Sequence, residues 1–402
     1  MQGGVFLFFL YLCINCIVIN VMKIVYLYDS LALIGGLERI LTDKMNYLAD
    51  VYGYDVFLIT SSQGNKLSAF PLSAKVKHID LGINIHHQYQ YLYPKRIWIK
   101  RQKNRLFKNR LTGVINQIKP DILVCPTNFR ADIVCQLKCS AHKIIESHCA
   151  KSYTGINEGT KRNLFVGALH KLYMQYFTYI IRSKSNAIIT LTHGDKKEWD
   201  LSNKTYVIPN IITKIPNGIS SCSNKLVISV GRLTCQKGFE RLISAWKEVN
   251  KRYPDWSLNI YGTGEVEGAL QNQIKEAQLE NVITINPPTP DIYTKMQESS
   301  IFVFPSRYEG FGLVLIESMI NGVPCISFDC PYGPSEIIKN GHDGFLIPNG
   351  NIQAMADKIC FLIENENVRK EMGKKARHSA MRYAPENIMP LWDKLFNEIV
   401  NK

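Results

Sequence analysis

The sequence lacks the short motifs by which several common functions are recognised. No Walker-type loop occurs in the 402 residues, which excludes a P-loop nucleotide site. No Asp-X-Asp pair occurs either, so the usual acidic metal motif is missing. There is no tandem repeat at a short fixed period and no low-complexity tract, which argues against a repeat architecture.

The cysteines also lack a regular pattern. Eleven are scattered along the chain, and Cys125, Cys325 and Cys360 lie inside apolar runs. Cys13 and Cys16 are separated by two residues but have no matching second pair, so they do not indicate a zinc or redox site. An odd number of cysteines at irregular spacing predicts reduced thiols in a cytosolic protein.

The first residues lack the charge pattern of a signal peptide. The run from Val5 to Ile19 is almost wholly apolar, but no Lys or Arg precedes it. It is also short for a membrane-spanning helix, unless it continues through Val21. Met22 opens a strand-like run typical of an α/β protein. We therefore expect the true start at Met22, with 1–21 a mis-assigned or disordered extension; a signal anchor is the alternative.

The composition is that of a globular protein with a basic surface. Hydrophobic residues make up 46% of the chain and charged residues 20%, and the length suits two domains that each have a core. The formal net charge of +14 predicts an anionic partner, which is a nucleotide, a membrane surface or nucleic acid.

Short apolar strands alternate with helical stretches, which predicts parallel sheets covered on both faces. The alternation breaks at Pro209–Ser223, which is rich in Pro, Asn, Gly and Ser, and then restarts. We predict an α/β fold of two Rossmann-like domains facing a ligand cleft. The expected division is an N-terminal domain over 22–208, a linker over 209–223, a C-terminal domain over 224–384, and a helix over 385–402 that can cross back.

Three glycine loops are candidates for contact with a ligand in the cleft. Gly35-Gly36 follows the first strand, where it lets a backbone approach a phosphate or sugar, although many such loops are simple turns. Gly231-Arg232-Leu233 with Lys237-Gly238 follows the first strand of the second domain; its two cations suit a diphosphate, or else they are solvated surface charges. Gly262 and Gly264 form a close-approach turn, because the third glycine comes too late for a dinucleotide fingerprint.

A fourth segment combines a strand, a glycine loop and a helix start. The apolar run Ile301–Phe304 ends at Pro305, Gly310 and Gly312 follow, and a helix opens near Leu313. The unpaired N–H groups and the dipole at such a helix start attract negative charge. This segment is therefore predicted to bind an anion.

Two glutamates accompany that anion site. Glu317 lies on an otherwise apolar helix, where a carboxylate is costly unless it meets donors. Ribose or sugar hydroxyls are such donors, and a structural arginine or backbone group is the alternative. Glu309 lies in the glycine loop, so the pair also fits a two-carboxylate glycosidase. The cations Arg232 and Lys237 argue against a glycosidase, which needs no nucleotide diphosphate.

Together these loops resemble glycosyltransferase family 4, retaining enzymes of the GT-B fold. The resemblance is specific over about 205–350 and thinner over 22–204. It rests on the following residues: Gly35, Gly36, Gly231, Arg232, Leu233, Lys237, Gly238, Gly262, Gly264, Glu309, Gly310, Phe311, Gly312, Leu313, Glu317, Pro324, Glu336 and Gly344-Phe345-Leu346.

The resemblance implies a role for each matched position. Arg232 and Lys237 hold the donor diphosphate, and Glu317 binds the ribose. Glu309 meets the donor sugar. The backbone of the loop from Gly310 through Phe311 and Gly312 to Leu313 lies against sugar and phosphate, the turn at Gly262 approaches the donor, and the Gly35-Gly36 loop closes over it. His148 stands near the position of a family histidine beside the sugar, with a satisfied core histidine as the alternative.

The same resemblance implies the chemistry. The acceptor attacks on the face from which the phosphate leaves, and that phosphate takes the acceptor proton; Glu309 as a covalent nucleophile is the less favoured route. The donor is a nucleotide sugar, UDP favoured over GDP, and neither metal nor cofactor is required. The run Cys330–Ile338 resembles enzymes of bacterial surface polysaccharides and lipid-linked oligosaccharides. The acceptor is then a glycan or a polyprenyl-diphosphate-linked sugar.

A basic stretch lies between Tyr89 and Arg110. It contains eight Lys and Arg residues and no acid, and Tyr89, Tyr91, Tyr93 and Trp98 are interleaved with them. Such a pattern favours an anionic membrane surface over nucleic acid; a solvated helix face is the plain alternative. We therefore expect a cytoplasmic protein peripheral on the inner face of the membrane, with no nucleic-acid partner.

Overall fold

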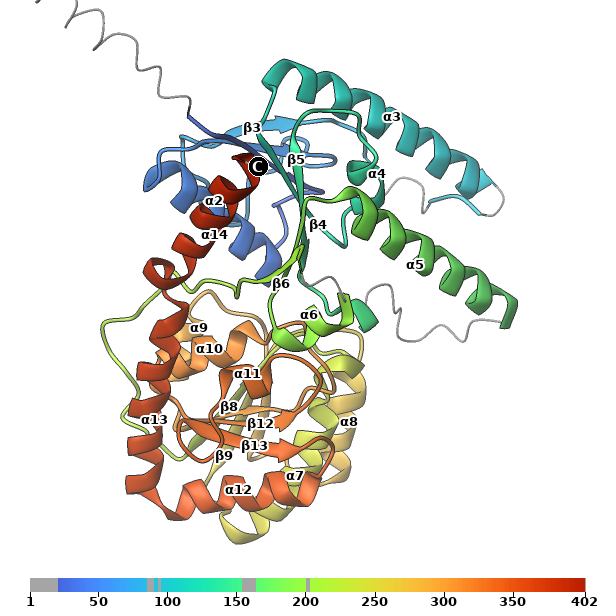
Figure 1. Cartoon of the computed structure of the whole chain (residues 1–402). Coiled ribbons are helices and arrows are strands. Elements are labelled where there is room, and N and C mark those ends of the chain that lie inside the picture. Colours follow the sequence, from blue (N-terminus) through green and yellow to red (C-terminus); the bar gives the residue numbers. More distant parts are fainter. Residues whose placement is uncertain (1–20, 85–89, 93–94, 154–163, 200–202, 402) are drawn as a thin grey trace, which may run out of the picture.

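The structure is a computed structural model that describes residues 21–84, 90–92, 95–153, 164–199 and 203–401 (Figure 1). Two parallel sheets lie in two units, one above the other in the view of Figure 1. The first sheet has the order β3-β2-β1-β4-β5-β6-β7, and the second has the order β10-β9-β8-β11-β12-β13. The predicted α/β fold of two Rossmann-like domains is confirmed. The expected leader, 1–21, lies outside the described residues except for its last residue.

The first unit alternates strands and helices, with one 3₁₀ turn. Its elements are β1 Lys23–Tyr28, α2 Gly36–Asp50, β2 Asp55–Thr60, β3 Lys77–Asp80, α3 Lys95–Ile118, β4 Ile122–Pro126, α4 Ala131–Cys135, β5 His142–Ser147, η2 Lys151–Tyr153, α5 Leu164–Lys184, β6 Ala187–Thr190, α6 His193–Trp199 and β7 Thr205–Val207.

The second unit repeats the alternation and ends in three helices. Its elements are β8 Leu226–Val230, η3 Cys235–Lys237, α7 Phe239–Arg252, β9 Ser257–Tyr261, α8 Glu267–Glu276, β10 Ile283–Asn286, α9 Ile292–Gln297, β11 Ile301–Phe304, α10 Leu313–Ile320, β12 Cys325–Asp329, α11 Pro334–Ile337, β13 Gly344–Pro348, α12 Ile352–Glu364, α13 Glu366–Ala380, η4 Met381–Tyr383 and α14 Pro385–Val400.

The central strands are buried along their length because helices cover both faces of each sheet. In β1, Ile24 pairs with Val56 of β2 on one side and with Ile122 of β4 on the other. All three side chains are fully buried. This explains why the sequence shows continuous apolar runs there instead of alternation.

The last helix joins the two units. Met389, Trp392 and Phe396 of α14 belong to the same buried cluster as the strands of the first sheet. In Figure 1 the red helix α14 rises from α13 beside the second sheet and ends next to the first. The C-terminal segment therefore contributes apolar surface to the core of the N-terminal unit.

The basic stretch folds as a helix with one apolar face. Ile99, Phe107, Leu111 and Ile115 of α3 are buried, and their separations of eight and four residues place them on one side. Tyr89 and Tyr93 lie outside the described residues. The sequence also predicts a helix over Thr160–Ile181, and its first residues, 160–163, lie outside them too. Within the described ranges, no helix has the length and apolarity to cross a membrane.

Candidate functional site at the cleft between the two sheets

The predicted site residues lie where the strand order of the sheets reverses. β1 pairs with both β2 and β4, and β8 pairs with both β9 and β11, so the loops leaving these strands diverge around a crevice. In the second unit these loops are 231–238 and 305–312. In the first unit the loop after β1 ends at Gly35, which precedes the first turn of α2, and Gly36 opens that helix.

Lys237 and Glu309 form an ion pair between the two loops of the second unit. Nζ of Lys237 lies 2.7 Å from Oε1 of Glu309, and the side chains are only 15% and 7% exposed. The ring of Phe304 lies 5.2 Å from the same Nζ, which also favours the cation. Arg232 is exposed, and no carboxylate within the described part of the chain pairs with it. The charge of Arg232 is therefore less neutralised by a neighbouring carboxylate than the charge of Lys237.

The glycine loop approaches the first unit at Gly310. A Cβ atom at Gly310 would collide with the backbone carbonyl oxygen of His148, just after β5. Burial raises the pKa of the neighbouring Cys149 thiol, and smaller effects on it come from Glu309 and Arg232. The structure therefore brings the predicted residues Glu309, Gly310 and Arg232 together with the segment of His148.

The other predicted glycine positions have defined packing roles. A Cβ atom at Gly262 would collide with the carbonyl oxygen of Gly231, so Gly262 holds the loop after β9 against the loop after β8. Phe311 is buried with its ring 5.7 Å from that of Tyr383, and its backbone carbonyl lies against Gly333. Gly312 precedes α10, Leu313 opens it, and no side chain caps its first N–H groups.

His148 is held by a buried ion pair. Its Nε2 lies 2.5 Å from Oε2 of Glu146, and Nζ of Lys44 lies 2.6 and 2.5 Å from the two oxygens of Glu146. Burial opposes the charge of Glu146, but Lys44 and His148 outweigh it and lower the pKa of that carboxyl to about 2. Burial lowers the pKa of Lys44, against the attraction of Glu146. His148 is therefore a partnered histidine that borders the glycine loop.

Glu317 meets an arginine from the opposite unit. Nη1 of Arg39, in the first turns of α2, lies 2.6 Å from Oε1 of Glu317, and Nη2 of Arg39 donates a hydrogen bond to the hydroxyl of Tyr293 at 3.2 Å. Burial raises the pKa of Glu317, and Arg39 acts in the opposite direction. The sequence analysis expected this carboxylate to meet either sugar or ribose hydroxyls or a structural arginine or backbone group. The structure contains the arginine.

Two residues of these networks were not identified from the sequence as site residues. Arg39 follows Gly36 by three positions. A cation in the first turn after a candidate phosphate loop is a pattern from which Arg39 could have been predicted as a site residue. Lys44 shares a face of α2 with Leu41, Met45 and Leu48, where a lysine requires an anionic partner. That partner, Glu146, lies 102 residues further along the chain, beyond any local pattern.

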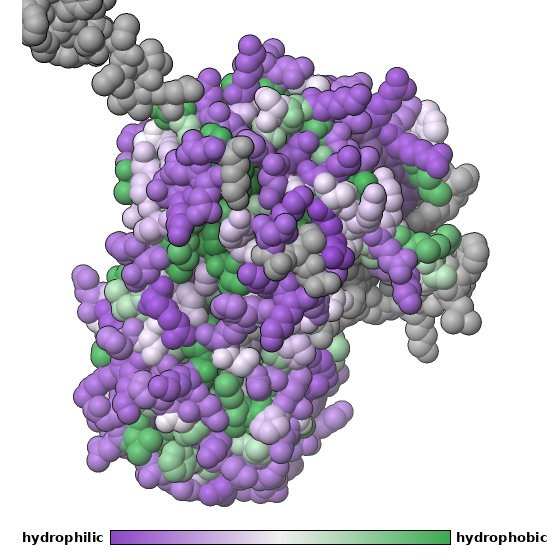
Figure 2. Space-filling view, in the orientation of Figure 1, coloured by the Kyte–Doolittle hydropathy of each residue, from purple (hydrophilic) through white to green (hydrophobic). Residues whose placement is uncertain are grey.

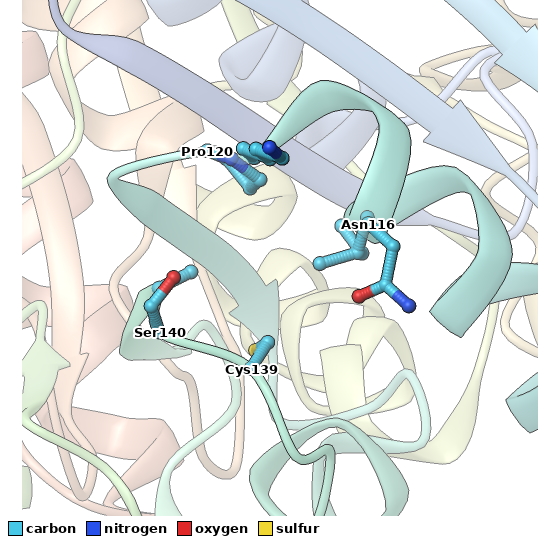
Figure 3. A pocket seen from close by; sticks show the side chains of 7 residues that line it. Asn116, Pro120, Cys139 and Ser140 are labelled. Carbon is cyan, nitrogen blue, oxygen red and sulfur yellow. The ribbon is translucent and has the colours of Figure 1, made fainter.

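Two pockets are lined by none of the predicted site residues. One has a volume of about 280 Å³ and is lined by Ile115, Asn116, Pro120 and Cys139, among others (Figure 3). It is at the amino ends of β4 and β5, opposite the carboxyl ends where the predicted residues gather. A larger hollow of about 1040 Å³ lies along α5, beside Lys151 and Glu198. Among the described residues, no group of three or more His, Cys, Asp or Glu side chains is arranged to hold a metal ion.

The fold and the cleft together define the GT-B class, in which two Rossmann-like domains face each other. A solved structure of this fold is that of a Staphylococcus aureus TarM variant in complex with Fondaparinux, alpha-GlcNAc-glycerol and UDP. It superimposes with a TM-score of 0.73 over 94% of this chain and 100% of that one, at 18% sequence identity.

Sequence relatives then give the family. The family described as Glycosyl transferases group 1 matches residues 215–379. An uncharacterized glycosyltransferase of Haemophilus influenzae is 30% identical over 92% of this chain and 98% of its own length. The amylovoran biosynthesis glycosyltransferase AmsD of Erwinia amylovora is 28% identical over 93% and 99%. The chain belongs to the glycosyltransferases, and residues 215–379 form its group 1 domain.

Proposed function

We propose that the protein is a retaining glycosyltransferase of family 4. It transfers a hexose or N-acetylhexosamine from a nucleotide diphosphate sugar, with UDP favoured over GDP, to a glycan or polyprenyl-diphosphate-linked acceptor in surface polysaccharide synthesis. The observation that carries the proposal is the meeting of Arg232, Lys237 and Glu309 with the His148 segment at the cleft. The name of AmsD supports a polysaccharide product, and UDP in the TarM complex supports the nucleotide.

The chemistry follows from the charges at the cleft. When the bond between the sugar and the diphosphate breaks, negative charge develops on the leaving phosphate. Arg232, Lys237 and the uncapped N-terminus of α10 stabilise that charge, so the proposed reaction needs no metal. The acceptor hydroxyl forms the new bond on the same face, and its proton passes to the leaving phosphate oxygen. Glu309, which is already paired with Lys237, contacts the donor sugar.

Glu317 is proposed to bind the ribose. Its Oε1 is held by Arg39 at 2.6 Å, and its side chain is 13% exposed. The second carboxylate oxygen makes no hydrogen bond to the rest of the described chain. It is therefore the atom proposed to accept the hydrogen bond from a ribose hydroxyl.

Thermal unfolding with a panel of sugar nucleotides tests the proposal. A ligand that binds only the folded state at 100 times its dissociation constant adds about 2.7 kcal/mol to the free energy of unfolding. We expect UDP and one UDP-sugar to raise the melting temperature, with GDP giving a smaller rise, and no hydrolysis of simple glycosides. Glycoside hydrolysis without nucleotide binding would instead identify a glycosidase, and a rise with oligonucleotides alone a nucleic-acid-binding protein.

We also propose that α3 and α5 place the enzyme on an anionic membrane. Leu169, Leu172, Tyr176 and Tyr179 of α5 are 49–66% exposed, at separations of three, four and three residues along one side of the helix. In Figure 2, green hydrophobic residues lie among purple ones on the side of the molecule where Figure 1 places α3 and α5. Neither helix contains an acidic residue, so two copies meeting through this face would repel. Exposed leucines favour lipid over nucleic acid.

A further inference from the structure

A line of buried groups leads from the C-terminal helix to the cleft. The ring of Trp392 in α14 lies 4.3 Å from Nζ of Lys44, and Lys44 contacts both oxygens of Glu146. Glu146 contacts Nε2 of His148, whose backbone lies against Gly310. The side chains of Lys44 and Glu146 are 3% and 2% exposed, and that of His148 is 10% exposed. Of the three ionisable groups in this line, His148 is the one that is partly exposed to solvent.

The hydrogen bonding determines which ring nitrogen of His148 carries a proton. Glu146 is ionised and can only accept hydrogen bonds, so the Nε2 atom at 2.5 Å must be the donor. Nδ1 has no hydrogen-bond partner among the described residues. In the neutral ring Nδ1 is then an acceptor, the form that can bind a hydroxyl hydrogen.

Burying the charges of Lys44 and Glu146 to hold the His148 side chain costs desolvation free energy. Removing one partner of such a pair leaves the other charge uncompensated. An apolar pair would fill the same space without that risk but would not orient an imidazole. The arrangement therefore indicates a requirement for a defined histidine tautomer at this place.

We propose that Glu146 and Lys44 are positioning residues that fix His148 as the Nε2–H tautomer, so that Nδ1 accepts a hydrogen bond from a hydroxyl of the bound donor sugar. The proposal rests on the proposed function for the identity of the substrate. The tautomer itself is a property of the free protein.

The informative substitution is Glu146→Gln, which keeps the shape of the side chain. Lys44 has only donors and would bind the amide oxygen, which leaves the amide NH₂ facing His148. Nε2 must then accept, and the proton moves to Nδ1. Glu146→Asp keeps the carboxylate and is expected to keep the Nε2–H tautomer. Arg369→Gln is the matched control, because it removes a buried cation that is 2% exposed and bonded to backbone carbonyls of the second unit.

Two measurements test the proposal. ¹⁵N NMR of the imidazole, assigned with His148→Gln, should show the Nε2–H form in the wild type and in Glu146→Asp, and the Nδ1–H form in Glu146→Gln. An Nδ1–H wild type would overturn the proposal, and so would a Glu146→Gln variant with an unchanged tautomer. This arm needs no substrate, so it still decides the positioning role if no sugar nucleotide is transferred.

The second measurement is a double-mutant cycle on transfer. We expect Glu146→Gln to lower kcat/KM for the donor about tenfold, because the lost hydrogen bond is one to the bound donor, and to have no further effect in a His148→Ala background. Arg369→Gln should lower the melting temperature but leave the tautomer unchanged. An equal loss from Glu146→Gln with and without His148 would show that Glu146 acts by stability alone, which contradicts the proposal.

Discussion

Lys237 carries a charge that the proposed reaction uses directly. We predict that Lys237→Ala lowers kcat/KM for transfer at least about tenfold, the scale of one lost charged contact to the leaving phosphate. Lys225→Ala is the control, because Lys225 also pairs with a carboxylate, Asp255, but its side chain is 61% exposed. Initial rates at several donor concentrations provide the measurement. Wild-type rates for Lys237→Ala would remove Lys237 from the donor site.

At the level of residues, the sequence revealed which side chains needed partners but not which partners they have. Glu317 was recognisable as a carboxylate on an apolar helix. Its partner, Arg39, is 278 residues away, and the two meet only because the two units face each other. Glu309 and Lys237 were both identified from their loops, but their mutual pairing depends on the close approach of the loops after β8 and β11.

The helices α3 and α5 are predicted to bind the surface of an anionic membrane. We expect the protein to float with vesicles of anionic lipid and not with vesicles of zwitterionic lipid. Each Lys or Arg near such a surface contributes about 1 kcal/mol, so replacing Lys100, Arg101 and Arg105 with Gln should weaken partitioning on the order of 100-fold. Replacing Leu169, Leu172 and Tyr176 with Ser should weaken it as well.

The matched control for that experiment removes equal charge from the other unit. Lys247, Lys275 and Lys375 are exposed residues of the second unit, and their replacement with Gln should leave flotation nearly unchanged. Equal losses from both triple variants would mean that net charge alone governs binding. Absence of flotation at low salt for the wild type would exclude the membrane proposal.

Elements were predictable where periodicity is long and strong. The sequence predicts strands over Leu226–Val230, Ser257–Tyr261 and Ile301–Phe304 and helices over Phe239–Arg252 and Ile352–Glu364. These are the bounds of β8, β9, β11, α7 and α12 in the structure. The short helices α4, α6, α9 and α11 were not predicted, because helices of four to seven residues are too short to be stable alone and depend on contacts from elsewhere. For α6 one such contact is Glu336 of the opposite unit, which accepts from the N–H groups of His193 and Gly194.

Several polar contacts hold the two units together around the cleft. Besides the pair of Arg39 and Glu317, the hydroxyl of Tyr332 bonds to Glu198, and the hydroxyl of Thr213 lies 2.6 Å from a carboxylate oxygen of Asp43. The sequence predicted a cleft between two domains but contained no signal for these contacts. Only the relative placement of the sheets determines them.

The last prediction concerns Arg39, which links the placement of the units to the proposed ribose site. Arg39 opposes the effect of burial on Glu317, so Arg39→Ala should raise the pKa of that carboxyl further. A protonated Glu317 accepts hydrogen bonds less well. We therefore expect the dissociation constant for UDP in Arg39→Ala to rise about tenfold, with a larger rise at pH 6 than at pH 8, as measured by calorimetry.

Tyr332→Phe is the matched control, because it removes the contact between the units that the Tyr332 hydroxyl makes with Glu198, and neither residue is among the charges that act on Glu317. Its dissociation constant for UDP should stay within about twofold of the wild type at both pH values. The sign of the Arg39 effect separates two roles. Weaker binding means that Arg39 holds Glu317 ionised and oriented for the ribose. Tighter binding would mean that Arg39 competes with the ribose for the same carboxylate, and unchanged binding that Glu317 is no nucleotide ligand.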